Sequence, residues 1–226
     1  AGTTGAAGTT GAAGKTGTAG TTGSAGTTGA AGTTGAAGTT GAGGHADGGT
    51  DAQSDAAPGA FMLTSSAFTA GTEIPLMYKC GTSPPVGMNQ SPPLAWTPGP
   101  AGTKSYAITL NHMAGDNSAH WALWDIPASV TSLAANVEHV AMPAMPAGAK
   151  QAQQNLDGFT GIGYLGPCPQ AANSRQSYIF TVWALGVTNL AGVTTSSTTA
   201  QAQAAIKAAA LTGGSATLIG TQIRTP

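Results

Sequence analysis

Large apolar side chains are confined to the part of the chain that begins at Phe61. The first 60 residues contain no Phe, Tyr, Trp, Val, Leu, Ile or Met. Gly, Ala and Thr bury too little area to offset the loss of chain entropy on folding. We therefore expect one domain over residues 61–226, preceded by a linker over 45–60 and a tail over 1–44.

The apolar pattern after Phe61 predicts a mainly β domain, because short apolar runs are separated by Pro and Gly. Ser105–Leu110 alternates, which predicts a strand with one buried face. His120–Pro127 and Tyr178–Leu185 are apolar on both faces, which predicts interior strands.

One helix is predicted near the C-terminus. Thr198–Leu211 is rich in Ala and follows Ser and Thr residues that are suited to an N-cap. Gly213 and Gly214 are expected to end this helix, and Ala216–Ile223 is expected to return to the sheet.

The tail has a strict period, with glycine at every third position from Gly2 to Gly44. Three residues make one turn of a polyproline-II or polyglycine-II-like helix, so these glycines line one edge that other main chains can approach. No proline before Pro58 fixes φ, so order would have to come from neighbouring strands, which favours association with copies of the same chain. The alternative is a low-complexity spacer. If the tail assembles with other copies, the glycines that form the contacting edge are Gly2, Gly5, Gly8, Gly11, Gly14, Gly17, Gly20, Gly23, Gly26, Gly29, Gly32, Gly35, Gly38, Gly41 and Gly44.

Charge and cysteine content narrow the function classes. A net charge of -1 with 7% charged residues disfavours nucleic-acid binding, and no apolar run is long enough to span a membrane. The two cysteines form either two buried thiols or one disulfide. Sparse charge, abundant Thr, Gly and Ala, and a potential disulfide favour an exported protein, located outside the cell, on its surface or in the periplasm.

Five motifs occur in the order of the phosphatidylethanolamine-binding, or Raf-kinase-inhibitor-like, family, and the chain resembles its bacterial branch over residues 61–224. The resemblance implies a β-sandwich-like fold with a small pocket for phosphate or another anion. It also implies a Cys80–Cys168 disulfide, because similar bacterial members often have cysteines at both places. The motifs are SPPLAW (Ser91–Trp96), PAGTKSYAI (Pro100–Ile108), HWALWDIP (His120–Pro127), GYLGPCP (Gly163–Pro169) and YIFTVWAL (Tyr178–Leu185).

Two of the four pocket elements that the family uses are replaced here. The Asp-x-Asp segment is replaced by Asn111–Asp116, and the second histidine by the sequence around Arg175 and Gln176. The resemblance implies that His120 matches the first histidine, that Gly166 and Pro167 match the loop, and that Tyr178 matches the aromatic residue that opens the last strand. His112 and Arg175 could take the place of the two missing elements. The predicted anion pocket therefore consists of His112, His120, Gly166, Pro167, Arg175 and Tyr178.

Other chemistry receives less support from the sequence. His112 and His120 could share a metal with Asp116, but a pocket-lining role is favoured, so no metal and no cofactor are expected. No Gly-x-Ser-x-Gly elbow or paired carboxylates are found, so we expect no enzyme activity.

Two functions remain. The first is an exported, self-assembling structural protein, such as a filament or surface-layer subunit, whose tail packs with neighbouring copies. The alternative is a soluble or surface-tethered binding module for a small anionic ligand, or an inhibitor of a protein partner.

Overall fold

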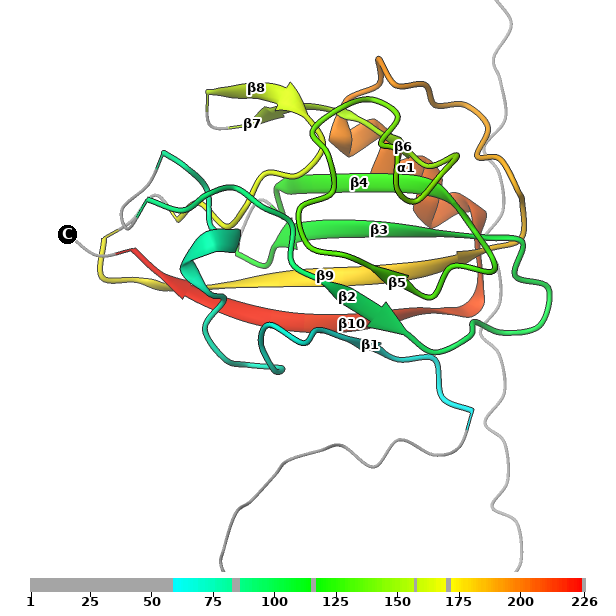
Figure 1. The fold of residues 1–226 in the computed structure, drawn as a ribbon, viewed down its shortest axis with the longest axis horizontal. Helices are drawn as coiled ribbons and strands as arrows, with labels where there is room; N and C mark the ends of the chain where they lie inside the picture. Colours follow the sequence, from blue (N-terminus) through cyan, green and yellow to red (C-terminus); the bar gives the residue numbers. More distant parts are fainter. Residues whose placement is uncertain (1–58, 83–85, 115–116, 157, 170–171, 225–226) are drawn as a thin grey trace, which may run out of the picture. The chain divides into compact units, whose positions relative to one another are not determined.

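The computed structural model describes residues 59–82, 86–114, 117–156, 158–169 and 172–224 (Figure 1). The predictions for the glycine repeat, Gly2 to Gly44, and for Asp116 lie outside these residues. The division into tail, linker and domain therefore stays a prediction.

A five-stranded antiparallel sheet forms the centre of the domain. The two predicted interior strands are confirmed, because β9 lies between β10 and β3, and β4 lies between β3 and β6. In order across the sheet, the strands are β10 (Ala210–Ile223), β9 (Arg175–Leu185), β3 (Ser105–His112), β4 (Ala119–Pro127) and β6 (Lys150–Gln151).

Within the described residues, two smaller sheets and a short 3-10 helix accompany the central sheet. The three-stranded sheet contains β1 (Leu63–Thr64), β2 (Leu94–Trp96) and β5 (Ser132–Leu133). The hairpin pairs β7 (Gln153–Leu156) with β8 (Phe159–Ile162), and η1 (Leu76–Tyr78) precedes the first cysteine.

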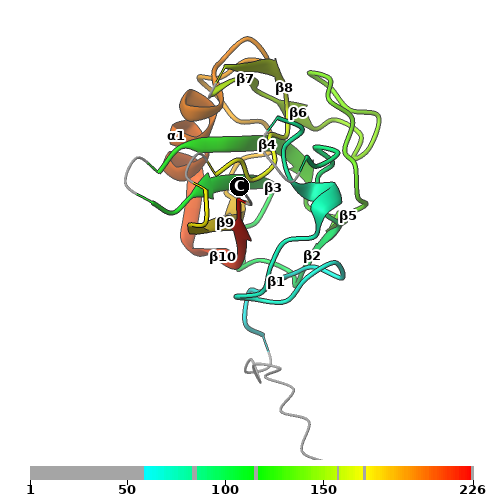
Figure 2. The same ribbon diagram turned by 90° about the vertical axis from the view of Figure 1, so that its left-hand side faces the viewer.

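Other elements lie against both faces of the central sheet (Figure 2), and β3 and β4 are buried along most of their length. One face packs against the three-stranded sheet, where Leu63, Leu94 and Leu133 join the core cluster. The opposite face packs against α1 (Thr199–Ala209), through Ala202 and Ile206. This arrangement confirms the mainly β, sandwich-like fold with one C-terminal helix.

The prediction of a half-buried strand at 105–110 is wrong. Every residue of β3 from Ser105 to Asn111 is buried, because α1 covers the face that carries the small and polar residues. The alternation of large and small side chains reflects two different packing partners, a sheet on one side and a helix on the other.

The helix begins as predicted but ends earlier than expected. Thr198 is the N-cap, and it forms a capping box with Gln201. The chain becomes extended at Ala210, so the helix does not reach Gly213. The glycines lie within a register irregularity between β10 and β9, and Gly213 has a φ of 69°.

Gln203 joins α1 to the sheet. Its Nε2 donates to the carbonyls of Leu110 (3.1 Å) and Trp121 (2.9 Å), and its Oε1 accepts from Asn111 Nδ2 at 2.8 Å. The side chain is buried, so these hydrogen bonds replace those that water would make.

Among the described residues, no helix is both long enough and apolar enough to cross a membrane.

We expect Gln203→Leu to lower the free energy of unfolding by about 2–4 kcal/mol, because it removes the side-chain donor of two carbonyls and one of the two acceptors of the Asn111 amide in a buried environment. Urea unfolding measures the change. Ala208→Leu, on the exposed side of the same helix, is the control and should change stability by less than about 0.5 kcal/mol. Equal effects of the two substitutions would contradict the role of Gln203.

Candidate ligand-binding site

An irregularity in β4 determines where the His120 side chain points. Asn111 pairs with Ala119 and Leu110 pairs with Trp121, so His120 is an extra residue opposite the Leu110–Asn111 bond. A bulge of this kind commonly redirects a side chain. The His120 ring accordingly lies on the same side of the sheet as Trp121 and Tyr178.

Tyr178 lies between two histidines. Tyr178 and His112 are direct cross-strand partners on β9 and β3, and their rings stack with centroids 4.9 Å apart. His120 contacts Tyr178 edge-on at 5.3 Å. Three of the six predicted pocket residues therefore form one cluster of rings, in which His120 and Tyr178 are buried and His112 is partly exposed.

Each imidazole is oriented by a neighbouring oxygen. His120 Nδ1 lies 3.2 Å from the Leu165 carbonyl, which can only accept, so this nitrogen carries the proton. His112 Nε2 lies 3.0 Å from Gln176 Oε1, and Gln176 Nε2 donates to Ser174 Oγ at 2.6 Å. The two rings are therefore fixed by a main-chain carbonyl and by an amide side chain.

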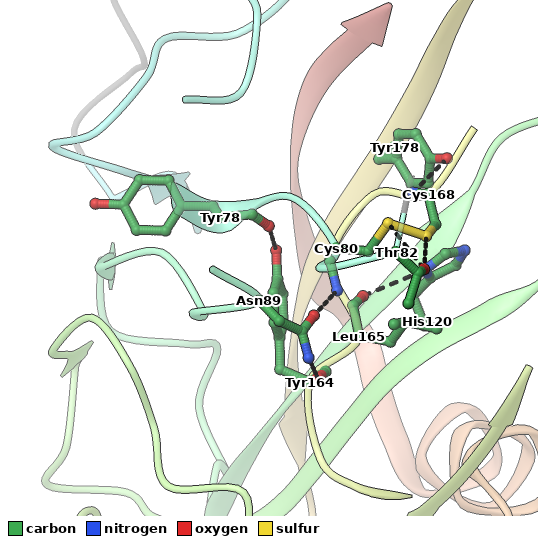
Figure 3. Close-up of a disulfide and its surroundings, with 10 residues drawn as sticks. Tyr78, Cys80, Thr82, Asn89, His120, Tyr164, Leu165, Cys168 and Tyr178 are labelled. Atoms are coloured by element: carbon green, nitrogen blue, oxygen red, sulfur yellow. Dashed lines mark hydrogen bonds between the residues drawn. A yellow bond between two sulfur atoms is a disulfide. The ribbon is translucent and has the colours of Figure 1, made fainter. Parts of the chain in front are cut away.

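The segment from Leu165 to Cys168, which includes Gly166 and Pro167, lies beside His120 and Tyr178 (Figure 3). Its main-chain N–H groups all donate within the protein: Leu165 to the His120 carbonyl (3.0 Å), Gly166 to Asn89 Oδ1 (2.7 Å) and Cys168 to Tyr178 Oη (3.1 Å). Pro167 has no N–H to offer. An anion at this site would therefore be bound by side chains, not by the amides of the loop.

The predicted disulfide between Cys80 and Cys168 is present, and the two Cα atoms are 5.4 Å apart. It connects the segment after η1 to the Gly166–Cys168 segment. The connection is reinforced by the Cys80 N–H, which donates to the Pro167 carbonyl at 3.1 Å. Because Cys168 also binds Tyr178, the disulfide holds this segment against the ring cluster.

Asn89 provides a second attachment for the same segment. Its Oδ1 accepts from the Gly166 N–H, and its Nδ2 donates to the Tyr164 carbonyl at 3.2 Å. Its backbone lies in the left-handed region, with a φ of 55°, which Asn tolerates better than most residues. Sequence reasoning gave Asn89 no role, because its two partners are 75 and 77 residues away.

The Tyr164 side chain is an uncharged hydrogen-bond donor near this segment. Its hydroxyl donates to the Tyr78 carbonyl at 2.8 Å. Burial raises the pKa of Tyr164 well above its usual value, and the neighbouring Tyr178 and Tyr78 add to the effect. The hydroxyl therefore keeps its proton and its hydrogen bond over the physiological pH range.

Arg175 is not brought into the cluster. Residues on β9 alternate between the two faces, so Arg175 lies on the opposite face from Tyr178, and its Nη1 donates to Thr221 Oγ1 at 2.9 Å. Gln176, not Arg175, lies on the face of Tyr178 and contacts His112. The site therefore has two histidines and an amide, without a guanidinium from this strand.

The described carboxylates are all engaged away from the rings. Glu73 pairs with Lys79, Asp125 pairs with Lys150, and Glu138 accepts from the Ala144 N–H. Within the described part of the chain, no three His, Cys, Asp or Glu residues are grouped as metal ligands would be.

A cavity of about 380 Å³ lies elsewhere, lined by residues between Val130 and Pro146. None of the six predicted pocket residues lines it.

Comparisons of this chain with family models and with curated proteins point to the same family. A family model described as phosphatidylethanolamine-binding protein matches residues 64–221. The chain is 33% identical to YbcL of Escherichia coli over 133 residues, which are 58% of this chain and 71% of YbcL. It is 34% identical over 169 residues to LppC of Mycobacterium tuberculosis, which is named as a lipoprotein, with 73% of this chain and 74% of LppC covered.

Solved structures agree with this similarity. The crystal structure of Escherichia coli YbcL, described as a new member of the mammalian PEBP family, matches with a TM-score of 0.62 and 28% identity. The match covers 72% of this chain and 98% of that structure. A PEBP homologue from Chlamydia trachomatis matches with a TM-score of 0.55 and 28% identity, over 73% of this chain and 98% of the other.

Removal of the disulfide by Cys80→Ser with Cys168→Ser should lower the free energy of unfolding by about 2–5 kcal/mol, because the bond closes a long loop in the unfolded chain. Urea unfolding in the presence and absence of dithiothreitol measures this. The reductant should destabilise the natural protein and leave the double variant unchanged. An equal midpoint for the oxidised and reduced natural protein would contradict the expectation.

Gly166→Ala should destabilise the protein by at least about 2 kcal/mol, because the added Cβ would meet the main chain of Tyr78 and Lys79, with the Lys79 carbonyl carbon at 2.7 Å. Gly81→Ala is the matched control, since the nearest described atom to its added Cβ would be the Gly87 carbonyl oxygen, at 3.7 Å. Thermal unfolding compares the two variants. If both have the same melting temperature, the close approach at Gly166 does not matter for stability.

Proposed function

The chain belongs to the phosphatidylethanolamine-binding protein family, and on this basis we propose that its domain is a binding module for a small ligand with an anionic, phosphate-type group. The proposal is for binding rather than catalysis. The observation that carries it is the pair of imidazoles on either side of Tyr178, at one end of the central sheet.

Imidazole side chains suit this role chemically. A protonated imidazole carries positive charge and donates from both ring nitrogens, so two of them near each other can neutralise and orient a phosphate group. The described carboxylates are paired elsewhere, which supports the choice of an anion over a cation. His112 is the more exposed of the two and would be the first to meet a ligand.

We further propose that the protein is exported. A disulfide is stable in an oxidising compartment, and LppC, one of the relatives, is named as a lipoprotein. Self-assembly through Gly2 to Gly44 stays a prediction, because those residues lie outside the described structure.

The test is a titration with inorganic phosphate, followed by calorimetry and by the melting temperature. A ligand at 100 times its Kd should stabilise the protein by about 2.7 kcal/mol. His112→Gln and His120→Asn should weaken binding about tenfold or more, because each removes a charged hydrogen bond.

His139→Gln is the matched control, since this exposed histidine contacts the Asn89 carbonyl and lies outside the ring cluster. It should bind phosphate like the natural protein. The proposal would be contradicted if phosphate neither bound to the natural protein nor raised its melting temperature, or if all three variants lost the same amount of phosphate affinity.

A further inference from the structure

Gln222 has an unusual position on β10. Its side chain is completely buried, and its residue pairs directly with Gln176 across the two strands. Directly paired residues in an antiparallel sheet place their side chains on the same face. Gln222 therefore lies on the face of Gln176 and Tyr178.

Both amide atoms of Gln222 lack a hydrogen-bond partner among the described residues. The neighbouring Gln176 makes its hydrogen bonds elsewhere, since its oxygen contacts His112 Nε2 and its nitrogen donates to Ser174 Oγ. Burial of an amide without partners costs free energy, so native proteins rarely tolerate it without a bound group. Trp96 and Trp124 also have unpartnered indole nitrogens, but each is a single donor on a large apolar ring.

The unpartnered amide extends the ring cluster into a row of polar side chains. In order across the sheet, the row contains Gln222 on β10, Gln176 and Tyr178 on β9, His112 on β3 and His120 on β4. Most of the rest of this face is apolar core. The polar row therefore marks one end of the sheet as different from the remainder.

We propose that Gln222 is a specificity-determining residue that binds a hydroxyl group of the ligand, while the imidazoles bind its phosphate. This inference rests on the proposed function. A hydroxyl accepts from the amide nitrogen and donates to the amide oxygen, so it satisfies both atoms. Neighbouring strands are about 4.8 Å apart and each residue rises about 3.4 Å along a strand. Gln222 on β10 is two strands away from His112 on β3 and two residues further along, so their Cα atoms lie about 12 Å apart. That span exceeds a free phosphate ion and fits a phosphate monoester of a hydroxylated alcohol.

The proposal distinguishes Gln222 from a residue that stabilises the fold. Replacing an unpartnered buried amide with an apolar group of similar shape should leave stability unchanged or raise it. Gln203 offers the contrast, because its buried amide is fully bonded and its loss should destabilise the protein. A residue that binds at the expense of stability is typical of a functional site.

The experiment uses two probes, inorganic phosphate and glycerol 3-phosphate, with the natural protein, Gln222→Met and Gln222→Leu. Calorimetry measures both affinities, and urea unfolding without ligand measures stability. The natural protein should bind glycerol 3-phosphate about tenfold more tightly than phosphate. Both variants should lose this preference, keep their phosphate affinity, and unfold at an equal or higher urea concentration.

A measurement on the natural protein supplements the variants. The side-chain amide signal of Gln222 in a ¹H–¹⁵N spectrum, identified by its absence in Gln222→Met, should shift with glycerol 3-phosphate more than with phosphate. An unchanged signal, or an unchanged preference in the variants, would overturn the role of Gln222 and leave the phosphate site standing. Variants that lose stability would show that the amide is satisfied within the fold, for example by water, and would also overturn it. Failure of the natural protein to bind either probe would instead remove the proposed function itself.

Discussion

The extra residue in β4 is the feature on which both the helix attachment and the site depend. His120 lies opposite the Leu110–Asn111 bond, where the regular pairing of β3 and β4 is interrupted. On one face of the sheet, Gln203 binds the Leu110 and Trp121 carbonyls next to this interruption. On the other face, the His120 ring meets Tyr178. A regular strand would turn this ring or its neighbour Trp121 to the opposite face, because side chains alternate along a strand.

The site is held by connections that are distant in sequence. The disulfide, Asn89 and the close approach of Gly166 to the main chain of Lys79 all attach the same segment beside Tyr178. Rigid attachment of this kind reduces the entropy that a ligand must remove on binding. The ring cluster is therefore preorganised by parts of the chain that do not themselves belong to it.

The sequence predicted the four long strands of the central sheet and the helix start, and the family resemblance implied the disulfide, but the site was predicted less completely. His120 and Tyr178 were found because they lie within motifs that keep their order. Arg175 and Gln176 could not be separated by sequence, because only the register of β9 decides which of two adjacent residues faces Tyr178. Gln222 gave no signal, since its significance depends on which partners are missing around it. The alternation at 105–110 was misjudged because the helix α1, far away in the sequence, covers the second face.

The loop around Gly166 uses its main-chain donors to hold itself in place. At the proposed site, discrimination among ligands would then fall to side chains, and these lie on strands whose backbone pairing does not depend on their identity. Such a scaffold can acquire a new preference through one or two substitutions at the end of the sheet, without a new backbone conformation.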